Sequence, residues 1–363
     1  MQPALDQTEI LKSACRMAGG PSDRLSSEWR ARLELLLRDL DTGAGLTPLG
    51  RTLAYGQLVS ATANMVGMHR LWAQHPEIDA VRIERPIIIV GQMRSGTTRM
   101  QWLLACDERF RFTRFYESWA PFPRIAANRF FDDRTWRARV ALVAAKVLNP
   151  EFQTIHPTSA NAADEEIGFY NMLMLPAAYE AQWRLPRFVS HCEAMDKASL
   201  YFDFRHILQS IAWLRGCASD RPWILKVPQF AEDLAPLLAV FPDARVIHVT
   251  RDERAVAASS VSLVTNQMKL QSDDVDRGAI GREWSRKIAL RKARTAKALS
   301  ETAGPAIEVR YADVERDWRG SMRRVYAMLE MPFDQATECR MRLYVRASTS
   351  RKPHRYDTGD PAR

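Results

Sequence analysis

The chain has 363 residues, 46% of them hydrophobic and 26% charged, which is an ordinary composition for a globular protein with a sizeable core. Its 52 Lys and Arg exceed its 43 Asp and Glu, giving a net charge of +9, which suits an anionic partner such as a small ligand, a nucleic acid or a membrane surface. No stretch reaches the ~18 apolar residues of a membrane span. The five scattered cysteines form no C-x-x-C pair, and the N-terminus lacks the pattern of a signal peptide. We therefore expect a cytoplasmic protein with reduced thiols and no metal site.

Residues 1–80 are predicted to form a helical N-terminal cap. The segment RARLELLLRDL repeats leucines on one helical face, and YGQLVSATANMVGMHRLWAQH keeps the same spacing. Gly43, Gly45 and Pro48 separate the two helices. This part of the chain carries no motif that indicates chemistry.

The stretch IIIVGQMRSGTTRMQWLLACD, residues 87–107, has the order strand, glycine loop, helix. Four apolar β-branched residues at 87–90 predict a strand buried on both faces, as in a parallel sheet. Met100, Leu103 and Leu104 lie at i, i+3 and i+4 and begin a helix after the loop. This order is the context that a phosphate-binding loop requires.

Three further runs, at 223–227, 245–251 and 306–311, predict strands of the same sheet. Strands that alternate with helices predict an α/β fold, here the three-layer type of P-loop NTPases with a mainly parallel sheet. Residues from about 110 to 215 are instead rich in aromatic residues and Met, with Pro breaks. We expect this segment to be a helical lid over the carboxyl edge of the sheet, where ligands bind in such folds.

The loop at 91–98 almost matches the nucleotide loop G-x-x-x-x-G-K-[ST], but Thr97 stands where the lysine would be. Backbone N–H groups and a helix N-terminus can cradle an anion without that lysine, and Ser95, Thr97 and Thr98 add hydroxyl donors. The missing lysine disfavours a nucleoside triphosphate, because that lysine reaches the β- and γ-phosphates. Arg94 lies inside the loop and offers a forked guanidinium suited to another oxyanion.

A second feature lies in RVIHVTRDERAVAASS. Arg251 ends a predicted strand and Ser259 follows eight residues later, two turns into the next helix. An arginine at a strand tip and a nearby serine can bind a second phosphate.

Together these two features resemble the sulfotransferases that use 3'-phosphoadenosine 5'-phosphosulfate (PAPS). In that family a loop reading P-[KR]-S-G-T-T holds the 5'-phosphosulfate, and an Arg and a Ser at the spacing seen here bind the 3'-phosphate. The resemblance extends to a bacterial branch through FYESWAPFP, HPTSANAADEE, WILKVPQF and AVFPDARVIHVTRD, so it covers about residues 84–335. It implies transfer of a sulfuryl group from PAPS to a hydroxyl, giving a sulfate ester and 3',5'-ADP. The residues implied to bind the donor are Arg94, Ser95, Gly96, Thr97, Thr98, Arg251 and Ser259.

The same resemblance suggests catalytic residues. Arg94 and Lys226, the latter in the segment that matches the family's L-K-x-P, would neutralise the leaving phosphate oxygen. Several bacterial members use a glutamate some twenty residues after the loop as the base, and Glu117 lies 23 residues after Arg94, among aromatic residues that would make it a stronger base. His156 is the rival base. Asp164, Glu165 and Glu166 are expected instead to pair with arginines or to shape the acceptor pocket.

The sequence departs from the family pattern at three positions. Met93 replaces the loop proline, which donates nothing. Val227 and Phe230 replace the serine and histidine of the bacterial segment L-K-S-P-x-H. The loss of that histidine favours Glu117 as the base, or a role for the histidine in acceptor recognition. The alternative is a protein that binds the donor but has altered catalysis.

The expected organisation is a cap at 1–80, a sulfotransferase domain at 81–340 and a basic tail at 341–363. Seven Lys or Arg against two Asp lie between Arg340 and Arg363. The aromatic lid suggests an acceptor with apolar surface, such as a phenol, a lipid or a glycolipid. A P-loop kinase is the alternative, with Asp252 as its Mg²⁺ ligand. No nucleic-acid signature is present.

Overall fold

The computed structural model describes residues 3–125, 132–149, 158–216 and 221–349. Its centre is a five-stranded sheet in the order β2-β3-β1-β4-β5, in which every neighbouring pair is parallel. The strands are β1 (Ile87–Val90), β2 (Arg111–Phe112), β3 (Trp223–Lys226), β4 (Arg245–Thr250) and β5 (Ala306–Arg310). The predicted α/β class with a parallel sheet is therefore confirmed, and β2 is a strand that the sequence did not reveal.

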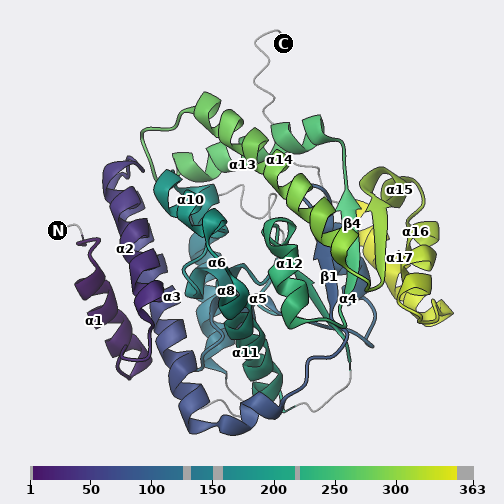
Figure 1. Ribbon diagram of the computed structural model, residues 1–363, viewed down its shortest axis with the longest axis horizontal. Helices are drawn as coiled ribbons and strands as arrows, with labels where there is room; N and C mark the ends of the chain where they lie inside the picture. The colour runs from purple at the N-terminus through teal and green to yellow at the C-terminus, as the bar shows by residue number, and fades with distance from the viewer. Residues whose placement is uncertain (1–2, 126–131, 150–157, 217–220, 350–363) are drawn as a thin grey trace.

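Helices lie on both faces of this sheet, as Figure 1 shows. Before β1 come α1 (Gln7–Ala18), α2 (Ser27–Thr42), α3 (Pro48–Gln74) and the 3-10 helix η1 (Pro76–Ala80). Between β1 and β3 come α4 (Thr97–Ala105), α5 (Phe115–Trp119), α6 (Asp133–Leu148), α8 (Ile167–Met172), α9 (Ala178–Gln182), α10 (Pro186–Ala194) and α11 (Ala198–Leu214). After β3 come α12 (Phe230–Val240), α13 (Glu253–Lys269), α14 (Arg277–Glu301), α15 (Tyr311–Arg316), α16 (Trp318–Met328) and α17 (Gln335–Thr349).

Strand β1 separates two hydrophobic cores. All four of its residues are buried, as the run of β-branched side chains predicts. Alternate residues of a strand point to opposite faces of the sheet. Ile87 and Ile89 accordingly join a core with α4 and α16, whereas Ile88 and Val90 join a core with α11 and α12. The result is a three-layer arrangement in which α4 packs directly behind the loop that follows β1.

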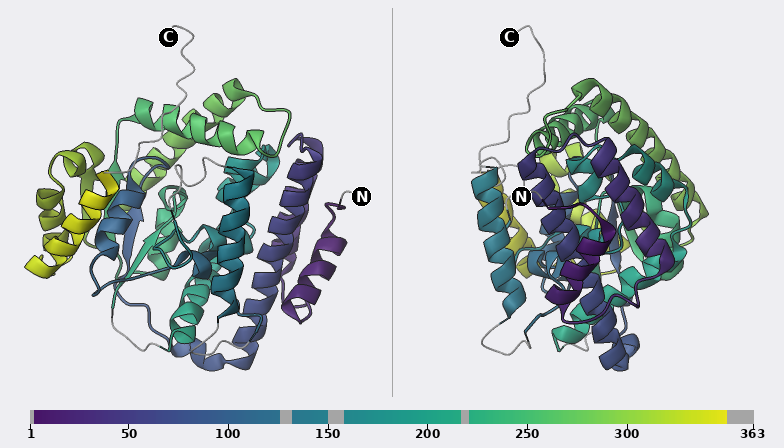
Figure 2. Two further views of the ribbon diagram at one scale, coloured as in Figure 1. Left: turned by 180° about the vertical axis from the view of Figure 1, so that it is seen from behind. Right: turned by 90° about the vertical axis from the view of Figure 1, so that its left-hand side faces the viewer.

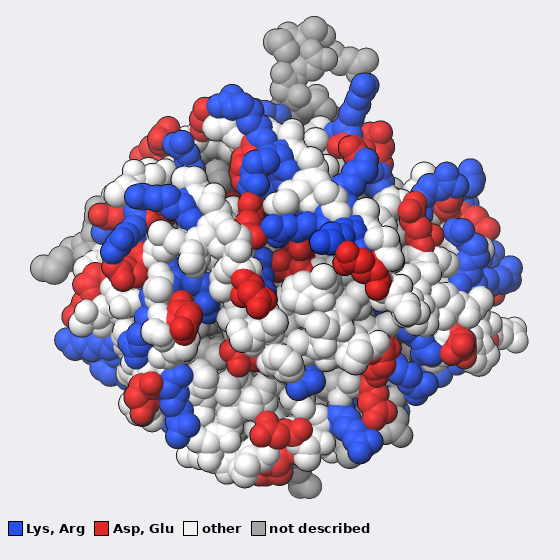
Figure 3. Space-filling model, viewed as in Figure 1, with Lys and Arg blue, Asp and Glu red and all other residues white. Residues whose placement is uncertain are grey.

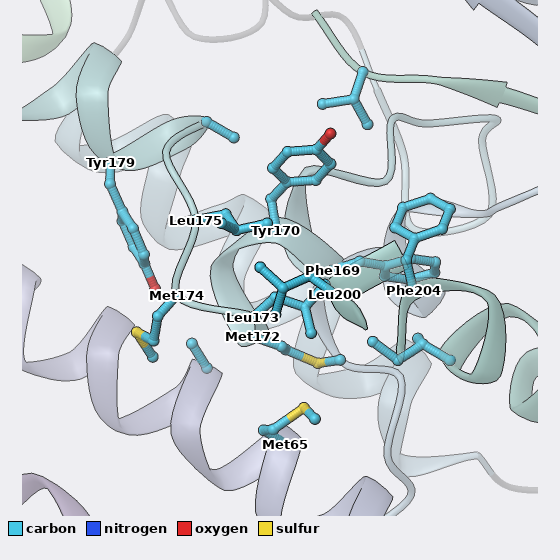
Figure 4. Close-up of a cluster of buried hydrophobic side chains, with 14 of the residues drawn as sticks. Met65, Phe169, Tyr170, Met172, Leu173, Met174, Leu175, Tyr179, Leu200 and Phe204 are labelled. Atoms are coloured by element: carbon cyan, nitrogen blue, oxygen red, sulfur yellow. The ribbon is translucent and has the colours of Figure 1, made fainter. Parts of the chain in front are cut away.

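The N-terminal helices share the larger of these cores. Met65 of α3 lies beside Met172 of α8, and Phe169, Leu173 and Phe204 belong to the same buried cluster (Figure 4). All five side chains are almost completely buried. Much of the aromatic and Met content between residues 110 and 215 therefore packs the core rather than lining open space.

Helices α1 to α3 and α15 to α17 lie at opposite sides of the molecule (Figures 1 and 2). Part of the segment expected as a basic tail belongs to α17, and Met341 of that helix is fully buried. On the face drawn in Figure 3, blue and red side chains lie side by side, so the positive charge is not gathered in one patch of that face. Within the described residues, no helix is long and apolar enough to cross a membrane.

Candidate active site

The loop between β1 and α4 has the geometry of an anion cradle. Gly96 adopts a left-handed conformation with φ of 100°, and α4 begins at the next residue. A Cβ at Gly96 would overlap the ring of Tyr311, so only glycine fits there. The first turn of α4 leaves backbone N–H groups without helical partners. The buried hydroxyl of Ser95, which has no hydrogen-bond partner, adds an orphaned polar atom at the same place.

The structure brings Arg94, Arg251 and Ser259 together beside this loop. Arg94 Nε donates to Ser259 Oγ at 2.9 Å, and Arg251 Nη1 donates to the Arg94 carbonyl at 3.0 Å. The Arg251 guanidinium also lies over the Tyr311 ring, 4.6 Å from its centre. The same ring thus packs against Gly96 and supports Arg251. Two motifs that are 157 residues apart in the sequence form one positively charged cluster.

Lys226 reaches the loop from the neighbouring strand. β1 and β3 are paired so that Ile89 lies opposite Lys226 at the carboxyl ends of the strands. The Lys226 ammonium is buried, donates to Thr98 Oγ1 at 3.0 Å and forms an ion pair with Glu165. A cation therefore stands at the first turn of α4, although the loop itself lacks the lysine of nucleotide-binding loops.

Glu165 is a functional candidate that the sequence reasoning missed. It was expected to pair with an arginine or to shape a pocket, but its partner is Lys226. Helix α4 fixes the segment that carries it, since Gln101 Nε2 donates to the Asp164 carbonyl at 2.8 Å. Three consecutive acids at 164–166 were the available signal, but the sequence did not indicate which of them meets the loop.

Glu166, the next residue, has a different environment. It is fully buried, and its Oε2 accepts a hydrogen bond from the backbone N–H of Lys226 at 2.8 Å. Burial raises the pKa of this carboxyl to about 8, although the Lys226 N–H acts in the opposite direction. Glu166 thus fixes the backbone at the end of β3.

Glu117 is fully buried at the start of α5 and bound on both oxygens. Arg215 Nε donates to Oε1 at 2.7 Å, a second nitrogen of Arg215 contacts Oε2, and the Arg114 backbone N–H donates to Oε2 at 2.8 Å. Arg215 also donates to the Phe112 carbonyl at 2.8 Å, which ties α11 to β2. These contacts give Glu117 a role in joining three elements, and Arg215 is a partner that no sequence motif indicated.

Three other residues singled out by the sequence, Phe230, Asp252 and His156, remain to be placed. Phe230, where the family pattern has a histidine, is fully buried against Tyr170 and Phe204. Asp252 caps α13 and accepts from the Ala255 N–H at 2.8 Å, so the acid that a kinase would need holds a helix instead. His156 lies outside the described residues. In the described ranges, no group of three or more His, Cys, Asp or Glu side chains could hold a metal ion.

Comparisons with known proteins show the family to which the chain belongs. A family model described as the sulfotransferase family matches residues 86–335. An omega-hydroxy-beta-dihydromenaquinone-9 sulfotransferase, Stf3, from Mycobacterium bovis and its counterpart from Mycobacterium tuberculosis are each 26% identical over 294 residues, 77% of this chain and 71% of theirs. The chain belongs to the sulfotransferase family, and it resembles the bacterial members of that family.

Two solved structures support the fold. Sulfotransferase STF9 from Mycobacterium avium superposes with a TM-score of 0.84 at 23% identity, over 97% of this chain and 90% of that one. Sulfotransferase STF1 from Mycobacterium tuberculosis superposes with a TM-score of 0.80 at 23% identity, over 93% and 92%. The N-terminal helices are thus included in the shared fold.

Proposed function

We propose that the protein transfers a sulfuryl group from PAPS to the hydroxyl of a lipid-like acceptor. The observation that carries this proposal is the meeting of Arg94, Lys226 and Arg251 around the loop at 91–98. Three cations from three different elements converge on a cradle of backbone N–H groups. Such a site suits a ligand with more than one anionic group.

The donor would occupy two parts of this cluster. The loop residues Ser95, Thr97 and Thr98, with the first turn of α4, would hold the 5'-phosphosulfate, because helix N-termini and hydroxyls bind anions. The orphaned hydroxyl of Ser95 fits this role. Arg251 and Ser259 would hold the 3'-phosphate, and the Tyr311 ring keeps the Arg251 guanidinium in place.

Sulfuryl transfer would then need a cation beside the leaving phosphate oxygen and a protein base beside the acceptor hydroxyl. The acceptor oxygen attacks sulfur, the bond between sulfur and the phosphate oxygen breaks, and the hydroxyl proton passes to the base. Lys226 and Arg94 would donate to the phosphate oxygen as its charge grows. The products are a sulfate ester and 3',5'-ADP.

Two described carboxylates and one histidine are candidates for the base. Glu165 lies beside Lys226 at the loop, which puts a carboxylate next to the cation of the leaving group. Glu117 is bound by Arg215 and by the Arg114 backbone, so it would have to exchange one of these partners to accept a proton. His156 stays a candidate from the resemblance alone. The geometry favours Glu165.

The acceptor is proposed from the relatives. The Stf3 proteins are named as sulfotransferases of an omega-hydroxylated menaquinone derivative. We extend this class, a hydroxyl on an apolar isoprenoid-like chain, to the present protein.

Calorimetric titration with 3',5'-ADP, 5'-AMP and ATP-Mg²⁺ tests the donor site. We expect 3',5'-ADP alone to bind tightly and Arg251→Ala to abolish most of that binding. Arg254→Ala, at an exposed position in the first turn of α13 that follows Arg251, is the matched control and should bind as the native protein does. Equal binding of 5'-AMP, or an undiminished affinity of Arg251→Ala, would contradict the proposed donor site. Transfer of labelled sulfate from PAPS to a hydroxylated isoprenoid then tests the reaction.

A further inference from the structure

Helix α6 (Asp133–Leu148) exposes an apolar face. Trp136, Val140, Val143 and Val147 are 60%, 49%, 64% and 75% exposed, and their spacing of four, three and four residues places them on one side of the helix. In the described part of the chain, five of the ten exposed large hydrophobic side chains lie on this helix. Such concentration differs from the scattered apolar residues of an ordinary surface.

The opposite side of α6 anchors it to the protein. Ala138 and Leu142 pack against Phe115, Tyr116 and Trp119 of α5. Arg134 lies over the Tyr116 ring at 5.2 Å and forms an ion pair with Asp132 at 2.7 Å. The helix is therefore held in a fixed orientation, with its apolar face turned outward. It stands at the left edge of the right-hand view in Figure 2.

The charges on α6 are arranged for an anionic surface. Its only acid, Asp133, is buried and paired with Arg137 at 2.8 Å. Two cations, Arg139 and Lys146, are exposed beside the apolar residues. An apolar face next to Lys and Arg is typical of helices that lie in the plane of a bilayer, with the apolar side chains below the headgroups and the cations among anionic lipids.

We propose that α6 binds the surface of an anionic lipid bilayer and thereby docks the protein on the membrane that holds its acceptor. The link between docking and the acceptor rests on the proposed function. Binding of α6 to a bilayer does not depend on that function. At 16 residues, or ~24 Å, and with two exposed cations, the helix lies on the bilayer rather than crossing it. A second copy of the chain is the less favourable occupant, because pairing two such faces would bring exposed Arg139 and Lys146 side chains from both copies into the same interface.

The apolar face of α6 is connected to the candidate active site through α5 and the segment before Glu165. α6 packs on α5, and the backbone at 113–116 pairs with the segment 160–164 that leads into Glu165. A bilayer bound at α6 would therefore lie on the side of the molecule that carries this segment, so a long apolar acceptor could enter without passing through water.

Cosedimentation with vesicles tests the proposal. We would compare phosphatidylcholine vesicles with vesicles of phosphatidylcholine and phosphatidylglycerol at low and high salt. The native protein should bind the anionic vesicles, and Val143→Glu/Val147→Glu should lower the partition coefficient at least about tenfold, since two apolar contacts are replaced by charges. Leu343→Glu, at a 60% exposed position of α17, is the matched control and should bind like the native protein.

Titration with 3',5'-ADP distinguishes a failure of the docking proposal from a failure of the proposed donor site. The Val143→Glu/Val147→Glu variant should keep the native affinity for 3',5'-ADP while losing the vesicles. Equal vesicle binding by this variant and the native protein, or no binding by either, would overturn the docking proposal whatever the donor titration gives. A native dimer in light scattering that becomes monomeric in the variant, without vesicle binding, would assign the face to a second copy instead.

Discussion

The ammonium of Lys226 donates a hydrogen bond of 3.0 Å to the hydroxyl of Thr98, which joins the end of β3 to the first turn of α4. This contact places a cation at the loop 91–98 from a neighbouring strand, 128 residues further along the chain. The position conventionally filled by lysine inside the loop is Thr97. The cation thus comes from the adjacent strand rather than from the loop, which fits the role proposed for Lys226 at the leaving phosphate oxygen.

Replacing Lys226 tests this role. We expect Lys226→Met to lower kcat for sulfuryl transfer by about 10²- to 10³-fold, because it removes one donor to the developing charge. Affinity for 3',5'-ADP should change much less. Lys297→Met, a 74% exposed lysine of α14, serves as the control. An unchanged kcat in Lys226→Met would exclude Lys226 from the chemical step.

The choice of base is tested by Glu165→Gln. If Glu165 accepts the acceptor proton, this variant should lose about 10²- to 10⁴-fold in kcat, because an amide cannot take up that proton. Binding of 3',5'-ADP should persist. Full activity in Glu165→Gln, together with loss of activity in His156→Ala, would assign the proton transfer to His156.

Glu117 and Arg215 form a buried ion pair, and we expect this pair to affect the free energy of unfolding. Removing one member leaves the other charge buried and unpaired, so Arg215→Met should cost roughly 3–5 kcal/mol of the free energy of unfolding. The double variant Glu117→Leu/Arg215→Met should recover much of this loss. Urea unfolding measures both.

The exposed pair of Lys297 and Glu301 provides the comparison for this prediction. On α14, Lys297 Nζ lies 3.9 Å from Glu301 Oε1. Because both side chains are exposed, Glu301→Gln should change the free energy of unfolding by less than about 0.5 kcal/mol. A stable Arg215→Met whose kcat falls steeply would instead support Glu117 as part of the chemistry.

The sequence predicted the elements that follow local patterns. The β-branched run at 87–90 and the glycines after it predicted β1, the loop and α4, because periodicity and turn chemistry are local properties. β2 was missed because Arg111 and Phe112 form a strand of two residues, which carries no periodicity. Its place at the sheet edge depends on pairing with β3, which is a tertiary contact.

The side-chain pairs of the site were less accessible to sequence reasoning. Arg94, Arg251 and Ser259 could be grouped only through the family resemblance, since the loop and the Arg251 strand tip meet across 157 residues. Which acid of 164–166 meets Lys226 depends on the backbone that Gln101 fixes. Arg215 lies at the end of α11 in a segment without a motif, so its pairing with Glu117 could be found only in three dimensions.

Gly96 should be the least replaceable residue of the loop. Gly96→Ala combines a left-handed φ of 100° with overlap of the Tyr311 ring, so we expect loss of stability and a large decrease in affinity for 3',5'-ADP. Gly281 lies inside α14, where an added Cβ would meet no neighbouring atom within 4 Å. Gly281→Ala should therefore stabilise the protein by about 0.5–1 kcal/mol. Thermal unfolding and calorimetry compare the two, and native affinity in Gly96→Ala would contradict the cradle geometry.

Glu166 predicts how stability depends on pH. Burial raises the pKa of its carboxyl from an ordinary value of 4.5 to about 8 in the folded protein. Between these two pH values the unfolded chain releases the proton while the folded chain keeps it, so the unfolded state gains stability as pH rises. The contribution of Glu166 is thus fully present below about pH 4.5 and is lost progressively up to about pH 8.

The variant Glu166→Gln isolates this effect, because its amide oxygen can still accept from the Lys226 N–H but cannot ionise. We expect the native protein to lose on the order of a few kcal/mol relative to Glu166→Gln between pH 5 and 8, measured by urea unfolding across that range. Glu301→Gln, at an exposed position, should show no such difference from the native protein. Parallel pH curves for native protein and Glu166→Gln would mean that the Glu166 carboxyl ionises near its ordinary pKa in the folded state, and that the end of β3 tolerates a buried charge beside Lys226.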